Sequence, residues 1–333
     1  MTKTPFVSIA PMMDRTDRHY RYFMRFLTKK TLLYTEMVHT KAIIHGNRDK
    51  LIGFDPSEKP LALQVGGSIP EELAICAKIA EDWGYDEINI NVGCPSSRVQ
   101  SGNFGACLMA DPELVAQGVA AMKERCSIPV TVKHRIGIDD IDRYEDMKRF
   151  VDIVSKENPA RFSVHARKAW LQGLSPKQNR TVPPIRYEDV YRLKKECPEL
   201  DIEINGEIKT HHQMKEHLQY VDAVMLGRAA YDNPWLFSTV DSQFFGSEDL
   251  GLTRLEVLEQ MIPYMEKSMR EGTKLMSITR HMLQLFAHRP GARLWKRELG
   301  TASAKQKNDM QAIHALINES VLAPILGDEH VQV

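Results

Sequence analysis

The chain has 333 residues, 43% of them hydrophobic, and its 44 Lys and Arg residues balance its 44 Asp and Glu residues. This is the composition of an ordinary globular protein, and the length suggests one large domain with a small one. Because the net charge of the chain is zero, overall charge gives no indication of a polyanionic partner. Only a local concentration of charge can indicate one.

The five cysteines form no CxxC pair and are odd in number, which argues against a disulfide framework or a zinc site. We therefore expect no bound metal and a reducing, cytoplasmic setting. No apolar signal segment precedes the strand-like start at Phe6, and no apolar run approaches the roughly 18 residues that cross a bilayer. Neither secretion nor membrane insertion is expected.

From Phe6 to about Trp235, short apolar segments alternate with amphipathic helical ones, which favours a parallel sheet with crossover helices. Eight strands are predicted, at Phe6–Ala10, Leu32–Met37, Leu61–Val65, Glu87–Asn91, Pro129–Lys133, Arg161–His165, Asp201–Asn205 and Asp222–Leu226. A doubly wound sheet is the rival, but it normally carries a glycine-rich fingerprint after an early strand. The first strand instead ends in Ala10-Pro-Met-Met-Asp14. The fold class predicted is therefore an α/β TIM barrel of the (β/α)₈ type.

Helices are predicted between the strands, most clearly at Pro70–Trp83, Pro112–Cys126 and Tyr187–Cys197, with Asp111 as the N-cap of the second. Barrel enzymes carry their chemistry at the carboxyl ends of the strands. The fourth strand leads directly to Cys94, because Gly93 allows a turn and Pro95 ends the ladder. Taken alone, Cys94 would more often be a structural cysteine.

The other strand ends are unusually polar. Gln64 ends the third strand, Lys133 the fifth and His165 the sixth. Asn205-Gly206-Glu207 and Gly227-Arg228 follow strands seven and eight, where barrels commonly bind phosphate. Lys133, His165 and Gln64 could then contact a ring that gains negative charge, as a reduced flavin does. Spacing alone does not separate a flavin from a phosphorylated sugar.

Two segments concentrate basic charge. The stretch from Ala166 to Ile185 is long for a βα loop and contains Arg167, Lys168, Lys177 and Arg180 but no acid. Lys274 to Lys307 contains eight Lys or Arg residues and one acid, Glu298, a net charge of +7. Such charge is the footprint of phosphate-backbone binding, although a solvated lid and a solvated helical face are the plain alternatives.

After Phe245 the strand pattern stops and an all-helical segment begins. Thr253 and Glu256 form a capping box, and Leu255, Leu258, Met261, Met265 and Met269 form one apolar stripe. Pro263 should kink or divide this helix. Further helices are expected at about Leu275–His288, Leu294–Leu299 and Ser303–Val321, so the predicted domains are 1–245, a catalytic barrel, and 246–333, a helical bundle.

The ordered motifs resemble those of the tRNA-dihydrouridine synthases, most closely the bacterial A-type subfamily. The resemblance extends over nearly the whole chain: Ala10-Pro-Met-Met-Asp14, Leu63-Gln-Val-Gly-Gly67, Asn89-Ile-Asn-Val-Gly-Cys-Pro-Ser96, Val132-Lys-His-Arg-Ile-Gly137, Val164-His-Ala-Arg167, Ile204-Asn-Gly-Glu-Ile208, Gly227-Arg228, Asn233-Pro-Trp235 and Arg289-Pro-Gly-Ala-Arg293.

This resemblance implies a TIM barrel with noncovalently bound FMN, a helical tRNA-binding domain, and reduction of uridines 20 and 20a of the tRNA D-loop with NADPH. Hydride would pass from reduced FMN to C6 of uracil and a proton from Cys94 to C5. It further implies that FMN is held by Pro11, Met12, Met13, Gln64, Lys133, His165, Asn205, Gly206, Glu207, Gly227 and Arg228, and tRNA by Asn91, Lys177, Arg180, Arg293, Lys296 and Arg297.

An ordinary thiol is largely protonated at neutral pH and can donate, so Cys94 should have no cation that drives it to thiolate. The target base would have to leave its stack to reach the barrel mouth. The rival functions are a flavin barrel that reduces a small enone or carbonyl, and a noncatalytic RNA-binding protein. We expect no protein partner, and a monomer.

Overall fold

A computed structural model describes residues 6–305 and 310–318. The described chain forms two compact units: the first extends to Asp14 and resumes at Thr31–Gly227, and the second combines Arg15–Lys30 with the chain from Arg228 onward. The sequence suggested a single domain boundary after residue 245. In the structure, the boundary between the compact units falls after Gly227, and the N-terminal segment Arg15–Lys30 belongs to the second unit. The assignment of a separate function to each part stays a prediction.

The first unit is a parallel barrel. Its strands are β1 (Val7–Ile9), β2 (Leu33–Tyr34), β3 (Val38–His39), β4 (Leu61–Gly66), β5 (Glu87–Val92), β6 (Val130–Arg135), β7 (Arg161–His165), β8 (Ile202–Asn205) and β9 (Ala223–Leu226). They follow the order β1-β9-β8-β7-β6-β5-β4-β2, with β3 beside β4. A parallel bridge between Ser8 and Leu32 joins the two ends, and the Ile9 N–H donates to the Leu32 carbonyl at 2.9 Å. The predicted TIM barrel is confirmed.

One predicted strand is divided. Leu32–Met37 was expected to be continuous, but β2 and β3 pair separately with β4. At the break, the backbone N–H of Gln64 donates to the side-chain hydroxyl of Thr35, at 3.0 Å, instead of to a backbone carbonyl. A side chain thus replaces one bond of the ladder, and the strand is interrupted there.

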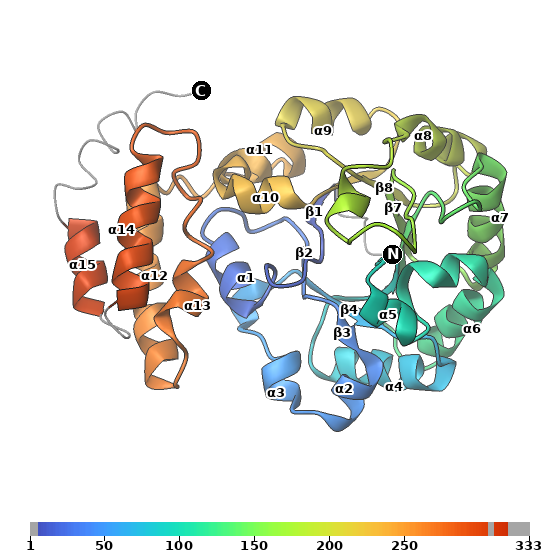
Figure 1. The fold of residues 1–333 in the computed structure, drawn as a ribbon, viewed down its shortest axis with the longest axis horizontal. Coiled ribbons are helices and arrows are strands. Elements are labelled where there is room, and N and C mark those ends of the chain that lie inside the picture. The colour runs from blue at the N-terminus through green and yellow to red at the C-terminus, as the bar shows by residue number, and fades with distance from the viewer. Residues whose placement is uncertain (1–5, 306–309, 319–333) are drawn as a thin grey trace. The chain divides into compact units, whose positions relative to one another are not determined.

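Helices surround this barrel in Figure 1: α2 (Thr40–His45), α3 (Arg48–Leu51), α4 (Pro70–Asp82), α5 (Ser97–Ser101), α6 (Pro112–Lys123), α7 (Tyr144–Val154), α8 (Tyr187–Glu196) and α9 (His211–His217). The three clearest predicted helices are α4, α6 and α8, and each begins at the predicted residue. Asp111 caps α6 as expected, because its carboxylate accepts from the Leu114 N–H at 3.1 Å.

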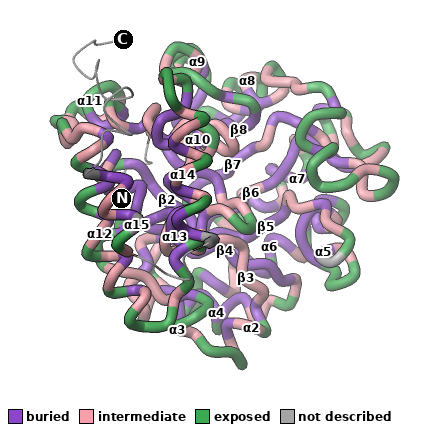
Figure 2. The backbone as a smooth tube through the Cα atoms, turned by 60° about the vertical axis from the view of Figure 1, so that its left-hand side comes forward, coloured by how far each residue is buried: buried purple, intermediate pink, exposed green. Residues whose placement is uncertain are grey.

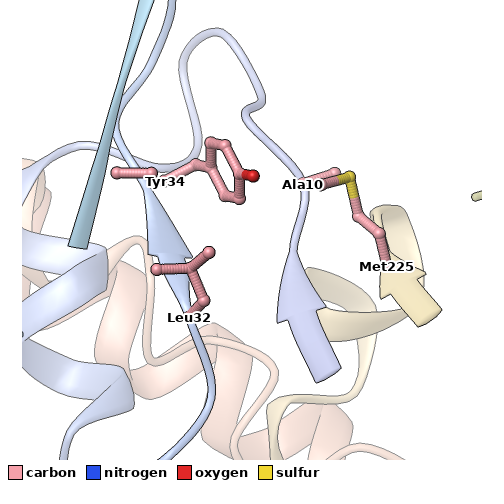
Figure 3. Close-up of a cluster of buried hydrophobic side chains, with 5 residues drawn as sticks. Ala10, Leu32, Tyr34 and Met225 are labelled. Carbon is pink, nitrogen blue, oxygen red and sulfur yellow. The ribbon is translucent and has the colours of Figure 1, made fainter. Parts of the chain in front are cut away.

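The strands are the most buried part of this unit, as the tube in Figure 2 shows. On the register of the parallel strands, one side of the barrel interior is apolar, with Ala10, Leu32, Tyr34, Ala62 and Met225 in one buried cluster. Figure 3 draws this cluster and labels Ala10, Leu32, Tyr34 and Met225. The strands β5 to β8 instead turn polar side chains inward, since Ile88 and Ile90 occupy the alternate face.

The second unit is helical where it is described, as predicted. Its helices are α1 (Arg18–Met24), α10 (Arg228–Asp232), α11 (Val240–Phe245), α12 (Arg254–Arg270), α13 (Leu275–Thr279), α14 (Ala292–Lys305) and α15 (Met310–Asn318). Thr253 and Glu256 form the expected capping box at the start of α12. Leu258, Met261 and Met265 are buried, whereas the two ends of the predicted stripe, Leu255 and Met269, are only partly buried.

Three helix predictions in this unit differ from the structure in whole or in part. First, α12 continues through Pro263, so of the two expected outcomes, a kink or a division, the division does not occur. Second, the helix predicted to reach His288 ends at Thr279, and turns follow. In these turns the carbonyl of Met282 accepts from the Trp295 indole N–H, and that of Leu285 from the Arg254 guanidinium, both at 3.0 Å. Side chains thus take up carbonyls that a longer helix would use.

The third difference concerns α14, which is continuous from Ala292 to Lys305 where two helices were predicted. The predicted continuation past residue 318 lies outside the described residues. Among the helices of residues 6–305 and 310–318, none is both long and apolar enough to span a membrane.

The N-terminal segment of the second unit is anchored by buried polar contacts. Asp17 caps α1, pairs with Arg280 at 2.5 Å, and lies 2.9 Å from the ring of His281. Farther along, the Asp241 carboxylate accepts from the Thr28 hydroxyl at 2.5 Å and from the Lys29 N–H at 2.6 Å. These contacts explain why the segment between β1 and β2 belongs to the helical unit.

Candidate active site

Cys94 lies in the turn that follows β5, where the sequence predicted it. The side-chain oxygen of Asn91 accepts from the backbone N–H groups of Gly93, at 3.1 Å, and Cys94, at 2.9 Å. On the other side, the Ala106 N–H donates to the Cys94 carbonyl at 2.9 Å. Gly105 has a φ of 77°, and a Cβ there would lie 2.6 Å from the same carbonyl oxygen, so a glycine is required beside the turn.

Burial raises the pKa of the Cys94 thiol above its ordinary value. A backbone N–H at Ser96 and the cations Arg135 and Arg180 act in the opposite direction, with smaller effect. Cations therefore lie near Cys94, but none drives it to thiolate, because the effect of burial is larger. The thiol remains protonated at neutral pH and can serve as an acid rather than as a nucleophile.

Behind Cys94, the amides of the barrel interior bond to one another. The Gln64 amide nitrogen donates to the Asn89 oxygen, and the Gln64 oxygen accepts from the Asn91 nitrogen, each at 2.8 Å. Gln64 and Asn91 are thus brought together, each with an N–H left over. The structure places both beside the Cys94 turn.

Lys133 on β6, which lies beside Asn91 in the sheet register, forms a second contact with Asn205 on β8. The Lys133 ammonium donates to the Asn205 oxygen at 3.2 Å, and the Asn205 amide donates to the Met225 carbonyl at 2.8 Å. Burial and, to a smaller extent, the nearby cation Arg135 together lower the pKa of Lys133 to about 8. An anionic ligand would relieve this unfavourable burial of a charge, which makes Lys133 a candidate anion contact.

The segment after β8 has backbone that few residues adopt. Gly206 has a φ of 133° and Glu207 one of 53°. A Cβ on Gly206 would lie 3.2 Å from Cδ2 of His165, so the glycine allows the histidine ring to approach closely. The Glu207 carboxylate is occupied by Arg167, at 2.9 Å, and the Gly206 carbonyl accepts from the Tyr187 hydroxyl at 2.6 Å.

The remaining predicted flavin contacts are placed by chain position. Pro11, Met12 and Met13 follow β1, and Met13 is 55% exposed. Gly227 directly follows β9, and Arg228 begins α10 of the second unit. Lys133, Gln64 and His165 provide an ammonium, an amide and an imidazole at three strand ends. Gly206 leaves close access to the imidazole, and this set of groups fits the predicted flavin.

The basic stretch Ala166–Ile185, here called the basic loop, is an ordered structure with two kinds of cation. Lys168 pairs with Asp142 at 2.9 Å and lies 4.0 Å over the Trp170 ring, and Arg167 binds Glu207. These two cations are internally neutralised. Lys177 and Arg180 are instead exposed, and Arg180 acts electrostatically on the Cys94 thiol.

Arg135 was missed as a site residue by sequence reasoning. Its side chain is buried and donates to four backbone carbonyls. These are the carbonyls of Gly93 at 2.8 Å, Lys168 and Asn179 at 3.1 Å each, and Arg167 at 3.4 Å. It therefore joins the turn of Cys94 to the start of the basic loop and to Asn179 farther along it. The sequence feature that could have identified Arg135 is its place in Lys133-His134-Arg135, at the end of a strand in which every second side chain faces the barrel interior.

In the second unit, the basic residues of α14 lie away from its buried side. Trp295 and Leu299 are buried, and Arg293 and Arg297, one turn apart, are exposed, with Lys296 partly buried between them. Arg297 pairs with Glu298 at 2.8 Å. The side chains of Lys305 and Lys307, which contributed to the +7 count, lie outside the described residues.

Comparison with known proteins gives one consistent family. The family model described as dihydrouridine synthase matches residues 8–321. A tRNA-dihydrouridine(20/20a) synthase of Synechocystis is 61% identical over 89% of this chain and 89% of its own length. Proteins of the same name from Vibrio parahaemolyticus and Escherichia coli K12 are each 54% identical, over 94% and 93% of this chain and 96% and 90% of their own lengths.

A solved structure shares the fold at low sequence identity. The complex of 2-naphthoyl-CoA reductase with 2-naphthoyl-CoA has a TM-score of 0.54 and 9% identity. The match covers 71% of this chain and 50% of that one. At this identity the likeness concerns the fold alone.

Proposed function

The chain belongs to the dihydrouridine synthase family and resembles its bacterial A-type members throughout, and on this premise we propose how its residues reduce uridine to 5,6-dihydrouridine in tRNA. The proposed targets are uridines 20 and 20a of the D-loop, the positions in the names of the relatives. The proposal rests mainly on one observation, a thiol held by backbone hydrogen bonds at a barrel strand end, where partial burial raises its pKa.

Cys94 is proposed as the acid that protonates C5 of the uracil. Addition of hydride at C6 leaves negative charge on the ring, delocalised onto the carbonyl next to C5. The thiol then gives its proton to C5, and the resulting thiolate recovers a proton from solvent. Arg135 and Arg180 stand close enough to favour that transient thiolate electrostatically, although burial keeps the resting group protonated.

FMN is proposed as the cofactor, with NADPH as its reductant. When bound and reduced, it supplies the hydride. Lys133 and Gln64 would contact the polar edge of its ring, and Lys133 would stabilise negative charge there. His165 would contact the same ring. The residues after strands β8 and β9 would line the phosphate end, namely Asn205, Gly206, Glu207, Gly227 and Arg228, and Pro11 to Met13 would complete the contacts.

The tRNA contacts proposed fall into two groups. Asn91, with a remaining N–H beside Cys94, would meet the target base. Lys177 and Arg180 of the basic loop, and Arg293, Lys296 and Arg297 of α14, would bind backbone phosphates. A flavin barrel that acts on a small enone would need no such helical segment, and the family match extends through it to residue 321.

The direct test uses purified full-length protein and unmodified tRNA. The protein should be yellow, and the chromophore released by heat should be FMN. With NADPH, nucleoside mass analysis should show dihydrouridine at positions 20 and 20a, and transcripts with cytidine at both positions should remain unmodified. Colourless protein that binds tRNA without product would support the noncatalytic alternative and reject this proposal.

A further inference from the structure

A continuous chain of hydrogen bonds crosses the barrel interior from a buried carboxylate to the Cys94 turn. It runs from Glu87 on β5 through Thr131 on β6, Asn89 on β5 and Gln64 on β4 to Asn91 on β5. Its links are Thr131 hydroxyl to Glu87 (2.6 Å), Asn89 amide to Thr131 (2.9 Å), Gln64 amide to Asn89 (2.8 Å), Asn91 amide to Gln64 (2.8 Å) and Cys94 N–H to Asn91 (2.9 Å).

The carboxylate at the far end gives this chain a direction. Glu87 is buried and ionised, because the Arg161 guanidinium donates to both of its oxygens, at 2.7 and 2.8 Å. An ionised carboxylate can only accept. The Thr131 hydroxyl must therefore donate its hydrogen to Glu87, which leaves the Thr131 oxygen to accept from the next residue.

The direction then fixes each amide in turn. Asparagine and glutamine amides have two orientations that exchange oxygen with nitrogen, and their hydrogen-bond partners decide between them. Asn89 must offer nitrogen to Thr131, so its oxygen faces Gln64. Gln64 must offer nitrogen to that oxygen, so its own oxygen faces Asn91. Asn91 consequently directs its nitrogen at Gln64 and its oxygen at the Cys94 turn.

The orientation of Asn91 matters because the turn contains only donors at this point. The N–H groups of Gly93 and Cys94 both point to the Asn91 oxygen. A reversed amide would set NH₂ against two N–H groups, and the turn would have to open. We propose that Thr131 is a positioning residue for the reaction, because it relays the acceptor character of Glu87 to Asn91 and thereby holds Cys94 in place. This inference rests on the proposed role of Cys94 as the acid.

The barrel offers a matched control for this idea. Ser163 on β7 is also a fully buried hydroxyl, and it donates to Glu203, a buried carboxylate that also lies near Arg161, at 3.5 Å. Within the described part of the chain, the hydrogen bond of the Ser163 side chain goes to Glu203 and not toward Asn91 or Cys94. Loss of either hydroxyl removes one donor from a buried carboxylate, but only Thr131 belongs to the relay.

The experiment compares Thr131→Val, Thr131→Ser and Ser163→Ala as full-length, flavin-loaded enzymes. Prereduced enzyme is mixed with tRNA, and dihydrouridine formation in a single turnover is followed together with the tRNA dissociation constant. Thr131→Val keeps the shape but removes the hydroxyl, and its rate should fall about tenfold or more, because small displacements of a reacting group are costly. Its tRNA affinity and flavin content should remain within about twofold. Thr131→Ser and Ser163→Ala should retain the wild-type rate within about threefold.

A measurement on the wild type protects the test against a variant that fails to fold. In the relay, the side-chain NH₂ protons of Asn89 and Asn91 should exchange with solvent far more slowly than those of an exposed amide such as Gln178. Fast exchange at Asn89 and Asn91 would overturn the proposal, as would a Thr131→Val rate equal to that of Ser163→Ala.

Failure of the proposed function is seen separately. If Cys94→Ala reduces tRNA at the wild-type rate, Cys94 is not the acid, whatever Thr131→Val does. If Cys94→Ala is slow but Thr131→Val is as fast as Ser163→Ala, the result supports Cys94 as the acid and rejects the positioning role of Thr131.

Discussion

The guanidinium of Arg135 donates to the carbonyl of Gly93, 2.8 Å away, on the residue that precedes Cys94. The same side chain also donates to the carbonyl of Asn179 in the basic loop, which directly precedes Arg180. One buried cation thus holds together the turn of the proposed acid and a proposed tRNA contact. Burial lowers the pKa of Arg135 only to about 10, so it stays charged at neutral pH.

Replacement of Arg135 with Met should loosen the basic loop. The substitution leaves buried carbonyls without a donor, at a cost of about 1–3 kcal/mol for each fully buried group. We expect faster trypsin cleavage after Lys177 and Arg180, and a lower rate of dihydrouridine formation. Arg143→Met, which removes an arginine whose side chain is 77% exposed just before the outer helix α7, is the control and should behave as wild type. Equal trypsin resistance of the two variants would contradict the bridging role.

Lys133→Met should change stability and cofactor binding in opposite directions: the flavin-free protein should become more stable, and flavin should be bound less well. Because burial lowers the folded-state pKa of Lys133 to about 8, the flavin-free protein is destabilised while Lys133 is charged in both states, below pH 8. The penalty fades as pH rises from 8 toward the unfolded value of about 10.4. Flavin-free Lys133→Met should therefore melt at a higher temperature than wild type at pH 7, and the difference should shrink by pH 9.

The same variant should retain less flavin, since it lacks the cation that would face the ring. Melting curves of stripped protein and flavin content after dialysis provide the two measurements. A variant that is less stable at pH 7 and fully loaded with flavin would contradict the assignment of Lys133. Lys156→Met, on the partly exposed turn after α7, is the control for loss of one lysine.

Arg293→Ala should weaken tRNA binding in a salt-dependent way. Arg293 is exposed on the face of α14 opposite the buried Trp295. If it neutralises one phosphate, the slope of log K against log salt should fall by about 0.7–0.9. Arg149→Ala, an exposed arginine on α7 in the barrel unit, should leave the slope unchanged. An unchanged slope for Arg293→Ala would remove it from the interface.

The barrel and its polar strand ends could be predicted because alternation and loop position are local properties of the sequence. Lys133, Asn205 and Gly206 stand where a barrel must place them, and the structure brings them together. Arg135 could be placed at a strand end, but not as a bridge, because its acceptors are backbone carbonyls of a distant loop. No residue pattern marks such acceptors.

The second unit was less predictable for a related reason. The segment Arg15–Lys30 follows β1, where a barrel helix is expected, and nothing local indicates that it packs with the helical unit. The pairing of Asp17 with Arg280 and His281 decides this, and it joins residues far apart in the chain. Helix α13 likewise ends early because Trp295 and Arg254 take the carbonyls beyond it.

Cys94 gives the most specific prediction, because an acid that acts after hydride transfer affects one half-reaction only. Cys94→Ala should bind flavin and be reduced by NADPH as wild type, whereas dihydrouridine formation should fall by about 10²–10⁴-fold, the usual contribution of a positioned general acid. Cys107→Ala is the control: this thiol is also partly buried and donates to the Phe104 carbonyl at 3.1 Å. It should leave both half-reactions unchanged.

The pH dependence follows from the sign of the shift at Cys94. Burial raises the pKa of the thiol, so the protonated, active form persists to higher pH than for an ordinary cysteine. The single-turnover rate should stay level through neutral pH and decline only above about pH 8.5, the value for a free thiol. Because Lys133 titrates near pH 8, rates are expressed per bound flavin at each pH. Cys94→Ala should lack the decline above pH 8.5. If it shows the same decline and as much dihydrouridine as wild type, Cys94 is a structural cysteine and another group supplies the proton.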